Sequence, residues 1–140
     1  MDSKKKIVVL GGGFGGLTAA QALDKFLRKN KNVEITLINK SPNQIYLTQL
    51  HEVAGNRIPE DGTLYSLESA LDQTRVKLVV DEISKVDVKA RKLYGVDNEY
   101  TFDYLILACG SEPAFFDIPG MKENAFTLWS HEDALRIRDH

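Results

Sequence analysis

The sequence has a single cysteine, no apolar run long enough to cross a bilayer and no excess of basic residues. Cys109 has no partner for an internal disulfide, which indicates a reducing compartment. A membrane-spanning helix needs about 20 consecutive apolar residues, and none of the apolar runs approaches that length. The net charge is −2 at pH 7, so the charge balance gives no reason to expect a nucleic-acid partner.

Only four apolar residues, 7–10, follow the lysines near the N-terminus, and this is too few for a secretory signal. We therefore expect a cytoplasmic location for the chain. Hydrophobic residues make up 43% and charged residues 27% of the 140 residues, which is typical of one soluble globular domain with a real core. The sequence contains no cluster of His and Cys with metal-ligand spacing, so we expect no metal site.

The first forty residues predict a strand, a turn, a helix and a second strand. Residues 6–10 and 33–38 are short apolar runs with many β-branched side chains, as expected of buried strands. Residues 17–28 carry apolar side chains at helical spacing, at Ala19, Ala22, Leu23, Phe26 and Leu27. This order predicts a βαβ unit with parallel strands and a right-handed crossover.

The rest of the chain extends this unit into a larger α/β fold. Residues 41–60 are expected to be irregular and residues 64–71 to form a short helix. Further strands are predicted at residues 76–80, 83–88, 92–94, 100–102 and 104–108, with a hairpin turn at 95–98. The predicted fold is a Rossmann-like domain whose parallel sheet has a crossover helix and an added β-hairpin or meander layer.

The end of the sequence predicts one more helix. Ser130 and Asp133 fit a capping box that opens it. The helical pattern is still running at His140, and natural domains rarely end inside such a segment. We therefore expect a truncated chain.

The glycine turn predicts a dinucleotide site. Gly11, Gly13 and Gly16 match G-x-G-x-x-G between a strand and a helix. The first glycine allows the tight turn, the second lets the backbone approach a pyrophosphate, and the third lets the helix pack closely on the strand. The phosphates would then lie at the helix N-terminus, where free N–H groups and the helix dipole favour anions.

Asn39 stands where dinucleotide folds usually carry Asp or Glu, 23 residues after Gly16. An amide can donate to and accept from ribose hydroxyls, but it lacks the charge-assisted hydrogen bond of a carboxylate. Lys40 beside it could tolerate a phosphate. Taken alone, this pair is compatible with NADP as well as with an adenosine-containing flavin.

Four segments together carry a family resemblance: residues 7–17 (IVVLGGGFGGL), 35–40 (ITLINK), 48–55 (TQLHEVAG) and 102–110 (FDYLILACG). They resemble type II NADH dehydrogenases, a branch of the FAD-dependent pyridine nucleotide-disulfide oxidoreductase superfamily. The first and last segments are shared by the superfamily, and the third points to this branch. Cys109 replaces the Thr of the Ala-Thr-Gly that ends the last segment in that superfamily, and we expect its side chain to be buried as a small hydrophobe.

The resemblance implies a flavoprotein oxidoreductase that passes electrons from NADH through FAD to a quinone. Residues 1–140 would be the N-terminal part of its FAD-binding domain. The NADH-binding domain and the C-terminal region would lie outside this sequence, since no second glycine fingerprint follows Gly16. We therefore expect the 140 residues alone to be inactive, and the full-length protein to contact the inner face of the cell membrane peripherally, through that C-terminal region.

The resemblance also predicts which residues contact FAD. It identifies no catalytic residue, and we interpret His51 as structural. The pyrophosphate would be held by the turn, Gly11, Gly13, Phe14, Gly15 and Gly16. The ribose would be contacted by Asn39 and Lys40, the ribityl chain or the isoalloxazine by Thr48, and the adenine by the backbone of Ile83. The remaining contacts would come from Ala108, Cys109 and Gly110, which close over the cofactor.

Two alternatives stay open. Disulfide-using relatives carry a cysteine pair in the region of residues 42–55, and sulfide:quinone oxidoreductase-like enzymes need further reactive cysteines. No cysteine occurs before Cys109, so the sequence argues against both of these cysteine-using classes, and the chemistry would run through the flavin alone.

The first open alternative is that the chain belongs to another two-domain NAD(P)H-flavin reductase. It could also be a non-catalytic NAD(P)-sensing Rossmann module, although the long link over residues 41–75 does not fit a simple sensor.

Overall fold

The computed structural model describes residues 4–140, which form two compact units. Among the described residues, the first unit contains residues 4–44 and Ser66–Gly110, and the second contains Ile45–Tyr65 and Ser111–His140. The chain leaves and re-enters the first unit through two short paired strands, β3 (Asn43–Ile45) and β4 (Leu64–Ser66). It leaves the first unit for the second time after Gly110.

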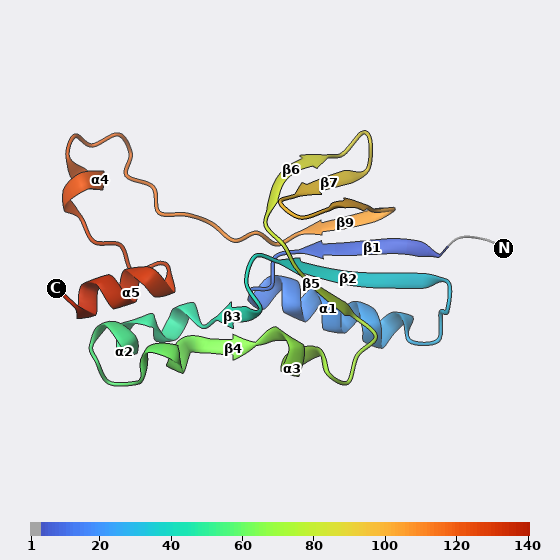
Figure 1. The fold of residues 1–140 in the computed structure, drawn as a ribbon, viewed down its shortest axis with the longest axis horizontal. Helices are drawn as coiled ribbons and strands as arrows, with labels where there is room; N and C mark the ends of the chain where they lie inside the picture. The colour runs from blue at the N-terminus through green and yellow to red at the C-terminus, as the bar shows by residue number, and fades with distance from the viewer. Residues whose placement is uncertain (1–3) are drawn as a thin grey trace. The chain divides into compact units, whose positions relative to one another are not determined.

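A four-stranded parallel sheet lies at the centre of the first unit (Figure 1). Its strands are β1 (Lys5–Leu10), β2 (Val33–Asn39), β5 (Lys77–Val80) and β9 (Tyr104–Leu107), in the order β5-β2-β1-β9. β1 pairs in parallel with β2 on one side and with β9 on the other. Helix α1 (Phe14–Leu27) connects β1 to β2, which confirms the predicted βαβ unit.

Alternation along β1 builds a separate core on each face of the sheet. Ile7 and Val9 belong to a cluster that also contains buried residues of α1 and α3 (Leu67–Leu71). Val8 and Leu10 belong to a second cluster, which includes Leu93 of a three-stranded antiparallel meander. The meander consists of β6 (Ile83–Asp87), β7 (Lys92–Gly95) and β8 (Glu99–Thr101), and it confirms the predicted added layer.

The buried face of α1 agrees only in part with the one predicted: Leu23 and Leu27 pack against the core as expected, but other residues form the centre of that face. The helix begins at Phe14, and its buried residues are Gly16, Ala20 and Asp24, spaced four apart. Phe26, which the apolar pattern placed on the buried face, is 82% exposed. The pattern was misleading because it counts neither a glycine nor an aspartate as a core residue, and these two occupy the buried face here.

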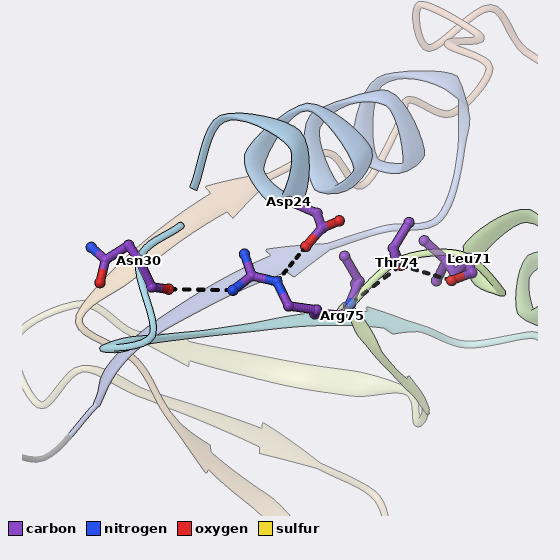
Figure 2. A network of polar contacts seen from close by, with 6 residues as sticks. Asp24, Asn30, Leu71, Thr74 and Arg75 are labelled. Atoms are coloured by element: carbon purple, nitrogen blue, oxygen red, sulfur yellow. Dashed lines mark hydrogen bonds and ion pairs between the residues drawn. The ribbon is translucent and has the colours of Figure 1, made fainter. Parts of the chain in front are cut away.

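Asp24 on this buried face is neutralised by Arg75. Asp24 is 4% exposed, and Arg75 Nε donates to its Oδ1 at 2.8 Å (Figure 2). Arg75 Nη1 also donates to the Asn30 carbonyl oxygen at 3.3 Å, and the preceding Thr74 hydroxyl donates to the Leu71 carbonyl oxygen at 2.7 Å. The hydrogen bond from Arg75 holds the pKa of Asp24 below its usual range. The pair therefore ties α1 to the segment that enters β5.

Arg75→Ala should destabilise the first unit by about 2 kcal/mol, because it leaves a buried carboxylate without its partner. Urea unfolding of Arg75→Ala, Asp24→Ala and the double variant would measure the coupling between the two side chains. The double variant should be more stable than Arg75→Ala, since no unpaired charge then remains buried. An Arg75→Ala protein as stable as the wild type would contradict this role.

The segment expected to be irregular contains several short elements. They are the 3-10 helices η1 (Leu47–Gln49) and η2 (Glu60–Thr63) and the helix α2 (Leu50–Ala54). The single helix predicted at residues 64–71 is divided into β4 and α3, because Ser66 acts as the N-cap of α3 and accepts a hydrogen bond from the Ser69 N–H at 3.2 Å. Elements of three to five residues show too little periodicity to be recognised in a sequence.

The second unit has a small core of its own, formed by α2 and α5 (His131–Arg138). Leu50, Val53 and Ala134 are its buried apolar residues. Arg138 Nη1 lies 2.9 Å from Glu60 Oε1 in an ion pair. The unit is therefore held together by residues from two segments that lie far apart in the sequence.

The predicted capping box at the start of α5 is confirmed. The Ser130 hydroxyl accepts from the Asp133 N–H at 3.0 Å, and the Asp133 carboxylate accepts from the Ser130 N–H at 3.2 Å. The expectation that this helix runs to His140 was wrong, because α5 ends at Arg138. The segment before it contains one short helix, α4 (Met121–Asn124). None of the helices within residues 4–140 has the length and apolar character that a bilayer crossing requires.

Candidate functional site

The glycine turn joins the C-terminal end of β1 to the start of α1 at the carboxyl edge of the parallel sheet. Gly11 has a φ of +105°, and a Cβ there would collide with the Ala108 carbonyl oxygen. A Cβ on Gly16 would collide with the carbonyl oxygen of Gly11. Both positions require glycine for the turn itself to form.

Gly13 and Gly15 are not explained by the fold. A Cβ at either position would meet no described atom within 4 Å, chain neighbours apart. Gly13 has an ordinary φ of −72°, and it is the N-cap of α1 without any described side chain bonded as a cap. The described first turn of α1 also carries no acidic residue. An open helix N-terminus of this kind is where backbone N–H groups and the helix dipole receive a phosphate.

Asn39 ends β2 beside the turn. Its Oδ1 accepts from the Gly12 N–H at 2.8 Å, and its Nδ2 donates to the carbonyl oxygens of Ser41 at 2.8 Å and Asn43 at 3.4 Å. A Cβ on Gly12 would come within 2.9 Å of the Asn39 Cγ, so the side chain packs directly on the turn. Lys40 follows and is exposed.

The strand β9 ends on the other side of the turn. The Ala108 N–H donates to the Leu10 carbonyl oxygen at 2.8 Å, and Gly110 has a φ of +78°. Cys109 is exposed, with its thiol 3.8 Å from the same carbonyl oxygen of Leu10. The expectation that Cys109 is buried was therefore wrong. It lies past the end of β9, which is the edge strand of the sheet among the residues that the structure describes.

Asp81, directly after β5, was not singled out from the sequence. It is 4% exposed, and its carboxylate accepts from the N–H groups of Val96 at 3.0 Å and Asp97 at 3.3 Å. It also accepts from the Tyr100 hydroxyl at 2.7 Å. That hydrogen bond from Tyr100 holds the pKa of Asp81 below its usual range, while burial raises the pKa of Tyr100. The Asp81 N–H donates to the Asn39 carbonyl oxygen at 3.0 Å, which links the end of β2 to the meander.

Asp81 also fixes the place of Ile83. Ile83 begins β6 and is paired in register with Gly95 of β7, and a Cβ on Gly95 would collide with the Asp81 carboxylate. The meander strand that carries Ile83 is thus held against the end of β5. In the sequence, the signal for this contact was an aspartate that follows an apolar strand and precedes a hairpin with a glycine. The sequence alone does not show that the aspartate and the glycine lie together.

Thr48 is the one predicted cofactor contact that belongs to the second unit, where it is exposed in η1. His51 follows in α2, with its Nε2 3.0 Å from Glu52 Oε1 and its side chain 60% exposed. Across residues 4–140 the structure brings together no group of three or more His, Cys, Asp or Glu side chains that could hold a metal ion.

The chain was compared with known protein families. The sequence model of the pyridine nucleotide-disulphide oxidoreductases matches residues 5–140. The chain belongs to this family. The type II NADH:quinone oxidoreductase of Staphylococcus haemolyticus is 34% identical to it over 139 residues, which are 99% of this chain and 34% of the relative. The chain thus spans about a third of the length of the curated relatives it matches.

Solved structures with the same fold are also found. The sulfide:quinone oxidoreductase from Aquifex aeolicus matches with a TM-score of 0.84 and 24% identity, over 96% of this chain and 31% of that one. NDH2 from Plasmodium falciparum in complex with NADH matches with a TM-score of 0.80 and 24% identity, over 96% of this chain and 28% of that one. At this identity, the match shows that the Rossmann-like fold is shared.

Proposed function

We propose that this chain binds FAD at the glycine turn, as the N-terminal FAD-binding part of a flavoprotein that passes electrons from NADH to a quinone. The main support for this proposal is that only some of the glycines in the turn are needed by the fold. Gly11 and Gly16 are needed to build the turn, whereas Gly13 and Gly15 leave open space at the start of α1. The similarity of the whole chain to a type II NADH:quinone oxidoreductase supports the choice of donor and acceptor.

The residues of the first unit fit FAD in chemical character. The backbone of the turn would hold the pyrophosphate, Asn39 and Lys40 would face the adenosine ribose, and the backbone of Ile83 would meet the adenine. Residues 108–110 would border the cofactor at the end of β9. Thr48 stays a prediction from the family resemblance alone. The chemistry that FAD supplies when bound is two-electron transfer, and the protein's part is to bind and orient it.

In this proposal residues 1–140 form only the first part of the FAD domain. The NADH site, the quinone site and the peripheral membrane contact would belong to the remainder of the full-length protein. We therefore keep the assignment for these residues to cofactor binding.

Titration of the purified chain with FAD, NAD and NADP in separate calorimetric experiments tests the proposal. We expect FAD to bind more tightly than either nicotinamide nucleotide, and the protein to keep the yellow colour of the flavin after free FAD is removed. Preference for NAD or NADP without flavin uptake would favour the sensing module. Binding of none of the three would contradict the proposal that these residues suffice to hold FAD.

The electron acceptor needs a separate experiment, because another two-domain NAD(P)H-flavin reductase would bind FAD equally well. NADH oxidation by the full-length protein would be measured with a soluble quinone and with other acceptors. Rapid reduction of the quinone is expected. NADH oxidation that proceeds with another acceptor but not with the quinone would contradict this part of the proposal.

A further inference from the structure

The amide of Asn39 has only one orientation that satisfies its neighbours. Gly12 presents an N–H group, so the amide oxygen must face it at 2.8 Å. Ser41 and Asn43 present carbonyl oxygens, so the amide nitrogen must face them at 2.8 and 3.4 Å. The side chain uses both of its donor hydrogens and one of its acceptor positions in these bonds.

A carboxylate could not replace this amide. Ionised Asp accepts hydrogen bonds but donates none, so its second oxygen would face the Ser41 and Asn43 carbonyl oxygens without a hydrogen between them. An alkyl side chain would leave the Gly12 N–H without its partner. Of these side chains only the amide both accepts from the turn and donates to the segment that leads into β3.

The bond to Gly12 bears directly on the phosphate-binding backbone. The turn is attached to β2 by the Gly11 N–H, which donates to the Ile38 carbonyl oxygen at 2.8 Å, and by the Gly12 N–H on Asn39. Gly13, which opens α1, is the next residue. This attachment therefore fixes the position of the N–H groups at the start of α1, which are the groups that would receive a phosphate.

We propose that Asn39 is a positioning residue that sets the glycine turn for its nucleotide, and that the site requires a neutral amide where related folds carry a carboxylate. The part of this inference that concerns FAD rests on the proposed function. Since the amide has no donor left, Asn39 can accept from a ribose hydroxyl but cannot donate to one. This differs from the expectation drawn from the sequence, in which the amide did both.

Asn39→Asp and Asn39→Ala test the proposal, with Lys40→Gln as a control in the unfolding experiments because it makes the same change in net charge at the neighbouring residue. At pH 7, Asn39→Asp should lower the melting temperature by about 5 °C and weaken FAD binding about tenfold. Asn39→Ala should speed hydrogen exchange in the peptide covering residues 10–16, because the Gly12 N–H loses its acceptor. Lys40→Gln should melt close to the wild type.

The pH dependence separates a missing donor from general damage. The Gly12 N–H lowers the pKa of the introduced carboxyl, but two carbonyl oxygens face it, so we expect a net rise above its unfolded value of about 3.9. Its cost is therefore complete above the raised pKa and disappears as pH falls below the unfolded pKa, where a protonated carboxyl can donate again. The melting difference between Asn39→Asp and the wild type should shrink between pH 7 and pH 4, while that of Asn39→Ala should stay constant.

A melting difference for Asn39→Asp that is absent at pH 7 or unchanged at pH 4 would overturn the proposal. Tighter FAD binding by Asn39→Asp would also overturn it, because a direct charged contact to ribose would then dominate. If the wild-type chain binds no FAD, the proposed function fails, but the melting and exchange measurements still decide the role of Asn39 in the turn.

Discussion

Gly13→Ala should weaken FAD binding strongly and leave the fold intact, whereas Gly16→Ala should damage the fold itself. A Cβ on Gly13 meets no described atom within 4 Å beyond its chain neighbours, and its φ of −72° suits any residue. The cost to folding should stay below about 1 kcal/mol, the usual effect at a helix N-cap. The same methyl group would occupy the place through which the backbone approaches the pyrophosphate, and we expect a loss of affinity of about 100-fold or more.

At Gly16 the added methyl group meets backbone, because its Cβ would collide with the carbonyl oxygen of Gly11. Backbone cannot move aside as a flexible side chain can, so we expect a cost of about 3 kcal/mol or more. Urea unfolding and FAD titration of both variants would separate the two effects. Gly15→Ala serves as a second open position. A Gly13→Ala protein that binds FAD normally would contradict the assignment of this turn to the pyrophosphate.

The stability of the first unit should decrease in acid, and Tyr100 should control part of this decrease. The Tyr100 hydrogen bond is the largest cause of the lowered pKa of Asp81. A group whose folded pKa is lowered stabilises the fold above its unfolded pKa, near 3.8, and this contribution is lost as pH falls through the folded value. The pKa values of Asp24 and Asp103, in the same unit, are also lowered.

Tyr100→Phe should therefore melt about 5 °C below the wild type at pH 7, and this difference should shrink as pH is lowered from 5 towards 2.5. Tyr100→Phe loses less stability than the wild type on acidification, because the pKa of its Asp81 in the folded state is closer to the unfolded value. Tyr94→Phe, in the adjacent strand of the meander, is the matched control. A Tyr100→Phe deficit of the same size at every pH would mean that the hydroxyl does not act through the ionised Asp81.

The sequence predicted the elements whose signals are local and repeated. Residues 6–10 and 33–38 are short, mostly apolar runs with many β-branched side chains, so they are recognised as buried strands. The glycine turn between them follows from the conformations that only glycine permits. The capping box of Ser130 and Asp133 is equally local, because both partners lie within one helical turn.

What the sequence did not predict depends on contacts between distant residues. Asp24 reads as a solvated helix residue until Arg75 is known to lie beside it, and Asp81 reads as a loop residue until Tyr100 reaches it. Cys109 reads as a buried hydrophobe because its neighbours in β9 are apolar. Its exposure follows only from the position of β9 at the edge of the sheet.

The discontinuous composition of the second unit bears on the order in which a chain leaving the ribosome can fold. Residues 45–65 are synthesised before their partners in α5, and the Glu60–Arg138 ion pair cannot form until α5 has been synthesised. Closing so long a loop is slow because its entropy is lost before any contact is gained. Until Ala134 has been synthesised, Leu50 and Val53 lack their packing partner and stay exposed. Apolar side chains exposed in this way on a nascent chain are binding sites for chaperones.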